Sequence, residues 1–544
     1  MLKKYFTLFA LFYFLSPVIP SSQEALKSFE EEYFDFLSLQ GLTKRPTLNY
    51  RTLSDSAWKI NEEDNHPWQE NNLGVFHKLF GDFRARIYCL DLFMSYNTNA
   101  PYGQNDGLLW QGRGFNALLK SGARFEGYGL ELTVLPHFAF SQNAYFEIMP
   151  SVYESEYGYF WGYGVDAPQR FGDKPFFDWC FGDSEIRYSW KTLTVGFGTQ
   201  AIWLGPSNIN SILHSNNAPA YPKLDIGLRR QRVTIPWINW YAGDVEVRFW
   251  TGRLSESDYF DSNNSNDFTM FHGLAFSYAP SFLPGLTLFV NRTCLVPWEW
   301  KNMKYIFPTN EKENINAIDD QKASFGLSWV FPQVGLEIYG ELGIDDFVPD
   351  NFPHGYIRYP LHSMTYTAGL KKIIPITPSK NIFGELLFEW NSMEMSQDFQ
   401  FQWPYSPYFH HQLIHGYTNK GQWLGVGSGW GGNSQYLGFK LYYLKGYSSI
   451  FIHRNNPDNN FLYSKAVNDS AEDGEMNIKY FSNWKSNFSI GIDTNYFLLN
   501  ALSLGAGFAY NHIINPYYYL YKTDFWKDDL TRNVSLYISL KIFI

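Results

Sequence analysis

From Phe83 onward, apolar and polar residues alternate with a period of two along most of the chain. The last segment shows this best, because one of its faces carries only Val534, Leu536, Ile538, Leu540, Ile542 and Ile544. Segments 502–511 and 336–342 repeat the pattern, with small or charged residues on the second face. A period of two is typical of β-strands, whose successive side chains point to opposite faces.

The alternation predicts eighteen strands, which we place from the pattern and from the turn residues between the segments. They lie near 84–96, 115–126, 128–139, 184–190, 193–200, 226–234, 244–253, 270–278, 285–294, 322–331, 334–344, 363–373, 380–391, 422–430, 434–445, 484–497, 499–511 and 531–544.

The connections between these strands alternate in length. Short ones such as 191–192 and 332–333 are each followed by a long one, such as 201–225 and 345–362. Outer-membrane barrels have short periplasmic turns, long external loops and an even number of strands. A sheet in hydrocarbon must also close, because unpaired backbone amides are costly there. The fold class is therefore all-β, with an 18-stranded antiparallel transmembrane β-barrel over residues 65–544; a two-domain soluble β-sandwich shares the alternation but does not explain the order of loop lengths.

The first 64 residues differ from the rest of the chain. Residues 1–22 are predicted to be a signal peptide, with Lys3 and Lys4 before an apolar stretch that is too short for a membrane-spanning helix. Residues 24–64 look helical, with apolar residues at helical spacing and a helix end at Gly41. We therefore expect a short helical periplasmic segment over 23–64, on the side of the short turns.

Composition excludes several classes of protein. Aromatic residues make up 19% of the chain, which argues against disorder. Mean hydropathy is −0.30, which does not fit a polytopic helical membrane protein. The formal charge of −10 gives no electrostatic support for a nucleic-acid partner. Three scattered cysteines are too few for a disulfide framework, although one bridge stays open.

Motifs for enzyme chemistry are weak. The glycine run 425–432 lacks the Lys-Ser/Thr of a phosphate-binding loop, and the histidines at 410, 411 and 415 lack the order of a zinc helix. A lipid hydrolase would need a serine, a histidine and an orienting residue in contact, and the adjacency of His214, Ser215 and Asn216 is not evidence of that geometry. We expect no catalytic residue, no metal and no cofactor.

Carbohydrate binding has better support. Sugars stack their C–H faces on aromatic rings and need amide or guanidinium partners for their hydroxyls. Loops 201–225 and 392–421 carry both kinds of residue, among them Trp203, Asn216, Asn217, Trp403, Tyr405, Tyr408, His411, Tyr417 and Asn419. An interfacial aromatic girdle with solvated loops is the alternative explanation.

The segment FGTQAIWLGPSNINSILHSNNAPAYPKLDIGLRR (197–230) resembles the signature of the Wzi-like capsule assembly proteins, and stretches 33–46, 408–425 and 452–463 agree with it. The resemblance implies an outer-membrane barrel of eighteen strands that acts as a lectin-like anchor for capsular polysaccharide. By this resemblance, the residues that match positions of the family's motif are Trp203, Gly205, Pro206, Ser215, Asn216, Asn217 and Arg229. The candidate polysaccharide-binding residues are Trp203, Asn216, Asn217, Arg229, Trp403, Tyr408, His411 and Tyr417.

The expected function is to hold or help assemble capsular or extracellular polysaccharide at the cell surface. The expected partners are that polysaccharide, outer-membrane lipid and the barrel insertion machinery, and the expected location is the outer membrane. An acidic polysaccharide would be repelled by the negative chain unless Arg229, Arg230, Arg232, Lys420 or Arg454 are exposed. The alternative is a porin-type diffusion channel for sugars or other small solutes, and a lipid hydrolase is the third hypothesis.

Overall fold

The computed structural model describes residues 17–18, 21–60, 65–161, 164–307, 318–345, 354–358, 361–396, 407–465, 483–518 and 529–544. Most of the predicted signal peptide, the end of the predicted helical segment (61–64) and Trp403 lie outside the described residues. None of the helices in the described part combines the length and the apolarity that crossing a bilayer requires.

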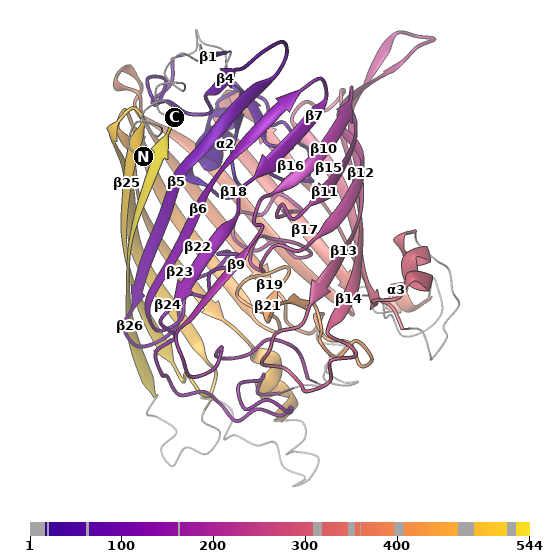
Figure 1. Ribbon diagram of the computed structural model, residues 1–544, viewed down its shortest axis with the longest axis vertical. Coiled ribbons are helices and arrows are strands. Elements are labelled where there is room, and N and C mark those ends of the chain that lie inside the picture. Colours follow the sequence, from indigo (N-terminus) through magenta and orange to yellow (C-terminus); the bar gives the residue numbers. More distant parts are fainter. Residues whose placement is uncertain are drawn as a thin grey trace, which may run out of the picture.

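The chain forms a closed antiparallel β-barrel (Figure 1). The last strand, β26, pairs with β5, for example through Leu540 and Leu92, and so closes the sheet. Two wall strands are interrupted, because β6 pairs with both β7 and β8, and these pair in turn with β10 and β9. With each interrupted strand counted once, the described residues form the predicted eighteen wall strands.

The wall strands are β5 (Arg84–Asn97), β6 (Gly114–Gly127), β7 (Leu130–Val134) with β8 (His137–Ser141), β9 (Phe176–Cys180) with β10 (Glu185–Trp190), β11 (Leu193–Gly198), β12 (Lys223–Ile235), β13 (Trp240–Ser255), β14 (Phe268–Pro280), β15 (Leu286–Pro297), β16 (Asp320–Phe331), β17 (Leu336–Asp345), β18 (Met364–Thr377), β19 (Ile382–Ser392), β22 (Asn433–Tyr443), β23 (Gly446–Asn456), β24 (Ser486–Leu499), β25 (Leu502–Ile514) and β26 (Leu530–Phe543). The other elements are β1 (Pro17–Val18), β2 (Ser21–Gln23), α2 (Phe29–Leu39), β3 (Ala57–Lys59), β4 (Phe76–Lys78), α3 (His354–Arg358), β20 (Thr418–Asn419), β21 (Gln422–Trp423) and the 3₁₀ turns η2 (Trp300–Ile306), η3 (Pro332–Val334) and η4 (Pro378–Lys380).

The two faces of the wall differ as the sequence predicts. On β12, Ile226 is 49% exposed on the outside, whereas the neighbouring Asp225 is 1% exposed inside the barrel. Apolar side chains therefore face outward, where a membrane protein meets lipid, and polar ones face the lumen.

One predicted strand is wrong and one was missed. Residues 422–430 form the end of a small hairpin, β20–β21, and then a glycine-rich turn in which Gly429 has φ +93°. The missed strand is β23, which follows β22 after a connection of only two residues. The prediction treated that tight turn as the start of a long loop, so the two errors compensated each other in the strand count.

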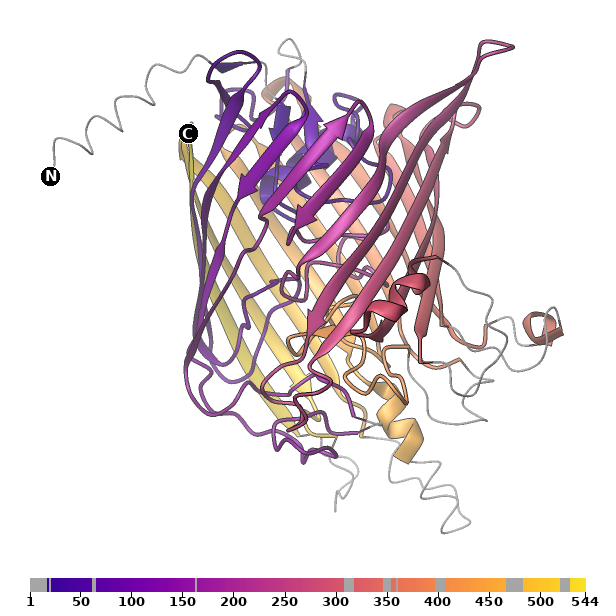
Figure 2. The same cartoon turned by 45° about the vertical axis from the view of Figure 1, so that its right-hand side comes forward.

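The N-terminal helix is shorter than predicted. Helix α2 begins after Ser28, whose hydroxyl accepts a hydrogen bond from the Glu31 N–H, and it ends just before Gly41, whose φ is +76°. The described residues that follow are mostly extended or irregular. We call residues 23–60 the plug segment, because Figures 1 and 2 show α2 within the barrel at the end where the short turns lie.

Ion pairs to inward-facing wall residues hold the plug segment in the barrel. Glu30 lies 2.6 Å from Lys541 of β26, and Glu32 lies 2.6 Å from Lys440 of β22. Other pairs reach β17, β18 and β13, and they join Arg45 to Glu337, Lys371 to Asp35, Lys44 to Asp244 and Asp55 to Arg248. The segment is therefore attached around the circumference rather than on one side.

Candidate functional site

At the other end, the long loops fold over the lumen and pack on one another through a buried aromatic cluster. Tyr408 and Tyr417 stack with ring centroids 5.1 Å apart. The Tyr408 hydroxyl accepts a hydrogen bond from the Val426 N–H and donates one to the Ile212 carbonyl. The Tyr417 hydroxyl lies 2.9 Å from the Leu213 carbonyl. These two tyrosines join the loops to each other, and their rings are not open to solvent.

Beside this cluster lies a cavity of about 280 Å³ that is lined by described residues of four long loops, 98–113, 142–175, 199–222 and 393–432. We call it the outer cavity. Its walls combine partly exposed aromatic rings with side-chain amides and one carboxyl group. These residues are Tyr102, Trp110, Tyr159, Trp423, Gln104, Gln111, Gln169, Asn217, Gln422 and Asp106.

Neighbouring groups fix the amides of the outer cavity in orientation. The Gln111 amide N–H donates to Asp106 at 2.8 Å, and its oxygen accepts from the Ser95 hydroxyl. Asn217 accepts from the Asn105 N–H at 3.1 Å and donates to the Trp423 carbonyl at 3.0 Å. Asn217 thus connects three of the four loops.

Two polar groups of the outer cavity are in unusual environments. Burial raises the pKa of Asp106 to about 7, so near neutral pH this side chain can accept or donate a proton. The indole N–H of Trp110 is buried and has no hydrogen-bond partner among the described residues. Both features favour a polar ligand that brings its own hydroxyls.

The predicted binding residues do not come together in one place. Asn217 lines the outer cavity, whereas Asn216 lines a second cavity of about 320 Å³, deeper in the lumen and next to the start of α2. His411 is exposed on its loop, with its ring 4.7 Å from that of His410. Tyr408 and Tyr417 belong to the loop core, and Trp403 lies outside the described residues.

Trp203 and Arg229 lie beside the plug segment. Trp203 is fully buried, with the Lys27 ammonium 5.2 Å and the Arg51 guanidinium 5.3 Å from its ring centroid. Arg229 pairs with Asp55 at 2.7 Å and with Glu131 at 2.6 Å. Both residues therefore connect the wall and loops to the plug segment, and whether they also bind polysaccharide stays a prediction.

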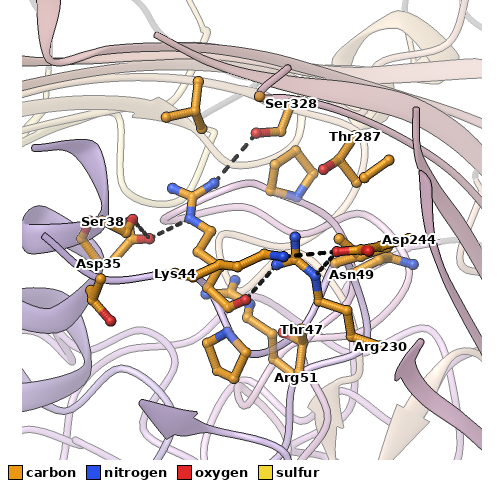
Figure 3. Close-up of a pocket in the computed structure, with 18 of the residues that line it drawn as sticks. Asp35, Ser38, Lys44, Thr47, Asn49, Arg51, Arg230, Asp244, Thr287 and Ser328 are labelled. Atoms are coloured by element: carbon orange, nitrogen blue, oxygen red, sulfur yellow. Dashed lines mark hydrogen bonds and ion pairs between the residues drawn. The ribbon is translucent and has the colours of Figure 1, made fainter. Parts of the chain in front are cut away.

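Two adjoining cavities of about 490 and 720 Å³ open between the plug segment and the wall at the short-turn end, and we call them together the inner vestibule. Figure 3 shows Lys44 and Arg230 converging on Asp244, at 3.0 and 2.7 Å. Burial alone would raise the pKa of Asp35, but the charges of Arg45 and Lys371 outweigh it and hold the pKa well below its usual range. The inner vestibule is a charged site, unlike the outer cavity.

The candidate hydrolase residues are not arranged for catalysis. The Ser215 hydroxyl donates to the Gly425 carbonyl at 2.6 Å. The His214 ring bonds the Ile202 carbonyl and the Tyr221 hydroxyl, and burial lowers its pKa to about 3. The two side chains therefore lack the hydrogen bond that activates a serine nucleophile. Within the described ranges, no group of three or more His, Cys, Asp or Glu residues could hold a metal ion.

Sequence reasoning missed most of the outer cavity. Loop 98–113 contributes Tyr102, Gln104, Asp106, Trp110 and Gln111, a mixture of aromatic and amide residues like that of the two loops considered. Composition could have identified this loop as a third candidate. It could not have shown that loop 98–113 meets loop 393–432, which lies some three hundred residues away in the sequence.

A family model described as "Capsule assembly protein Wzi" matches residues 177–460, more than half of the chain. No curated protein matches. Among solved structures, Wzi of Escherichia coli, described as a carbohydrate-binding β-barrel involved in group 1 capsule assembly, is 11% identical with a TM-score of 0.59, and the alignment covers 97% of this chain and 100% of that one. OccAB4 and OccAB2 of Acinetobacter baumannii are 9% and 11% identical, with TM-scores of 0.38 and 0.37, over 85% of this chain and 99% and 98% of theirs. The likeness to Wzi shows the fold, and the two lower scores carry no argument.

Proposed function

Because the chain belongs to the Wzi family of capsule assembly proteins, we propose that this outer-membrane β-barrel binds a capsular or other extracellular polysaccharide at its long-loop end and holds it at the cell surface. The carbohydrate binding of the E. coli protein that shares its fold supports this proposal. The observation that carries it for this chain is the outer cavity, where partly exposed aromatic rings lie beside fixed amides.

The outer cavity has the chemistry that sugar recognition needs. The rings of Tyr102 and Trp423 offer apolar faces for the C–H groups of a sugar. Amides such as Gln104 and Gln422 can each donate and accept, as sugar hydroxyls require. The volume of about 280 Å³ is close to the lower limit of about 300 Å³ for small-molecule sites, which suits one or two sugar units of a longer chain.

The proposed role is non-enzymatic. The hydrogen bonds of Ser215 and His214 lead away from each other, as described above. If the protein were a lipid hydrolase, it would hydrolyse ester substrates and the Ser215→Ala variant would not. We expect no turnover of ester substrates, and Ser215→Ala should leave polysaccharide binding intact.

A diffusion channel is the competing function. A barrel this wide conducts ions unless its lumen is filled. Here the plug segment occupies one end, and the loop cluster covers the lumen at the other. We therefore expect near silence in planar-bilayer recordings of the full chain, whereas large, steady conductance steps would favour the channel.

The direct test is glycan binding by the detergent-solubilised full chain, probed with the surface polysaccharide of the producing cell. Trp423→Ala removes an aromatic face from the outer cavity, and we expect the affinity to fall about two- to twelvefold, since one such contact is worth roughly 0.5–1.5 kcal/mol. Trp300→Ala is the matched control, because Trp300 is 85% exposed and does not line the cavity.

Cells that lack the protein should still make the polysaccharide but shed it into the medium. Equal affinity of Trp423→Ala and the unchanged protein, together with unchanged retention in the deletion strain, would overturn the proposal. Tyr102→Ala is a second variant that removes a ring face, in case Trp423→Ala perturbs the loop cluster against which Trp423 packs.

A further inference from the structure

One wall of the inner vestibule is formed by the β12–β13 hairpin, which extends beyond the neighbouring strand β11. Strand β12 pairs with β11 only as far as Leu228, yet it continues to Ile235 in pairing with β13. The register shifts after Leu228 and again after Val233, so the extension is bulged. Figure 2 shows this hairpin extending beyond the rim at the end where α2 lies. Trp237 at its tip is 95% exposed.

The extension places basic side chains over the mouth of the barrel. Arg230, Arg232 and Tyr241 of this hairpin line the larger cavity of the inner vestibule, of about 720 Å³. Seven basic and five acidic residues line that cavity. The chain as a whole carries a formal charge of −10, so this local excess of positive charge runs against the charge of the molecule. An anion is therefore repelled less here than the charge of the whole chain would suggest.

Two of these cations are not neutralised by the protein. Arg229, Arg230 and Arg84 all pair with carboxylates of the wall or the plug segment. By contrast, Arg232 and Lys59 are exposed and make no ion pair with any described residue. The Arg232 guanidinium lies 4.2 Å from the centroid of the Tyr241 ring, and this stacking holds a planar donor group in place.

We propose that the larger cavity of the inner vestibule binds an anionic group, a carboxylate or a phosphate, carried by a segment of acidic glycan. Arg232 provides a planar pair of N–H donors, and Lys59 of β3 provides a second positive charge from the plug segment. The class of ligand rests on the proposed function, whereas the anion chemistry rests on the cavity alone.

The position of the cavity favours a glycan over the membrane. It lies between the plug segment and inward-facing residues such as Glu131 and Asp244, which are buried, rather than on the lipid-facing surface of the wall. A chain of sugars can enter from the mouth, whereas a lipid headgroup would have to leave the plane of the bilayer.

The experiment is calorimetric titration of the detergent-solubilised full chain, at low salt, with a tetramer of galacturonate as the anionic probe and maltotetraose as the neutral one. The double variant Arg232→Ala/Lys59→Ala should lose affinity for the galacturonate tetramer at least about tenfold, because two charge-assisted contacts are removed. It should also show a weaker dependence of that affinity on salt. Lys380→Ala, which removes an exposed cation of a short turn outside the cavity, should bind like the unchanged protein.

The outcomes separate this proposal from the proposed function. Absence of tetramer binding to the unchanged protein, or equal binding by the double variant, overturns the anion site, whatever the outer cavity does. Loss of tetramer binding in Trp423→Ala but not in the double variant assigns the ligand to the outer cavity and overturns the inner site alone. If the double variant instead weakens binding to vesicles of phosphatidylglycerol and leaves the tetramer unaffected, the site binds lipid and the proposal is wrong.

Discussion

The two ends of this barrel are closed by different kinds of interaction. At the long-loop end, aromatic rings and neutral hydrogen bonds join the loops, as in the Tyr408–Tyr417 stack. At the short-turn end, ion pairs attach the plug segment to the wall, as between Glu32 and Lys440. The first kind of closure leaves a cavity lined with rings, amides and one carboxyl group, and the second leaves a vestibule lined with many charged residues.

Because of this difference, different changes should destabilise the two ends. At the short-turn end, buried carboxylates such as Asp55 are stabilised by cations from wall strands. Loss of one partner therefore leaves a charge without full compensation in the low-dielectric interior. The loop cluster contains few charges, so its stability depends on packing and on satisfied hydrogen bonds. The two ends should therefore respond separately to mutation, acid and salt.

The largest effect is expected from Asp55→Ala at the short-turn end. Arg248 is buried beside this carboxylate at 3.0 Å and would retain only Asp225, which also pairs with Arg187, so the buried cluster would lack one negative charge. Breaking a buried pair in this way costs about 3–5 kcal/mol, measured as loss of hydrogen-exchange protection in the plug segment. The control is Asp178→Ala, because Asp178 and its partner Lys420 are both partly exposed, and its effect should stay below about 1 kcal/mol. Equal effects of the two variants would contradict the contrast between the two ends.

A smaller effect is expected from Tyr408→Phe at the long-loop end. The change removes the hydroxyl that accepts from the buried Val426 N–H, and an unsatisfied buried donor costs about 1–3 kcal/mol. Hydrogen exchange should speed up in loop 407–432 and not in the plug segment. Tyr145→Phe, at a tyrosine that is 70% exposed, should change nothing measurable. Loss of protection in the plug segment instead would show that the two ends are coupled.

Glu32 at one end and Asp106 at the other should make contributions of opposite sign to the pH dependence of stability. In the plug segment, burial raises the pKa of Glu32 but the charges of Lys440 and Lys27 lower it to about 2, so its contribution is present above the unfolded value of about 4.3 and is lost as the pH falls toward 2. In the outer cavity, burial raises the pKa of Asp106 to about 7, so stability is highest below about 3.9 and declines as the pH rises toward 7. Hydrogen exchange at pH 3, 5 and 8 would resolve both trends, and Asp106→Asn should abolish only the second.

The smallest effect is expected from Lys44→Ala. This side chain pairs with Asp244 but is 69% exposed, so solvent screens the pair and its loss should cost less than about 1 kcal/mol. Raising the salt concentration should reduce the difference between the variant and the unchanged protein. A loss as large as that of Asp55→Ala would mean that the Lys44 pair is not screened.

Much of the barrel could be predicted from the sequence because its signals are local. The alternation along 530–543 and the length of each connection depend only on neighbouring residues. Where the local signal failed, the error was local too. The small residues of 425–432 fit a strand as well as a turn, and a two-residue turn before β23 was taken as a long loop.

The candidate site could be predicted only in part. Asn217 was identified and lies in the outer cavity, whereas Tyr408 and Tyr417 of the same prediction pack inside the loop cluster. Ring and amide content does not distinguish a residue that binds a ligand from one that joins two loops. Burial decides between these roles, and burial depends on loops that are distant in the sequence.

By itself, the sequence determined the alternating pattern of most strands, the face of each of these strands that meets lipid and the family to which the chain belongs, because these follow from the order of residues along a single segment. The tertiary structure alone decided that Glu30 meets Lys541 and that Trp203 lies between Lys27 and Arg51. Such contacts join residues that are more than 150 positions apart, and closure of the sheet brings their side chains into one lumen.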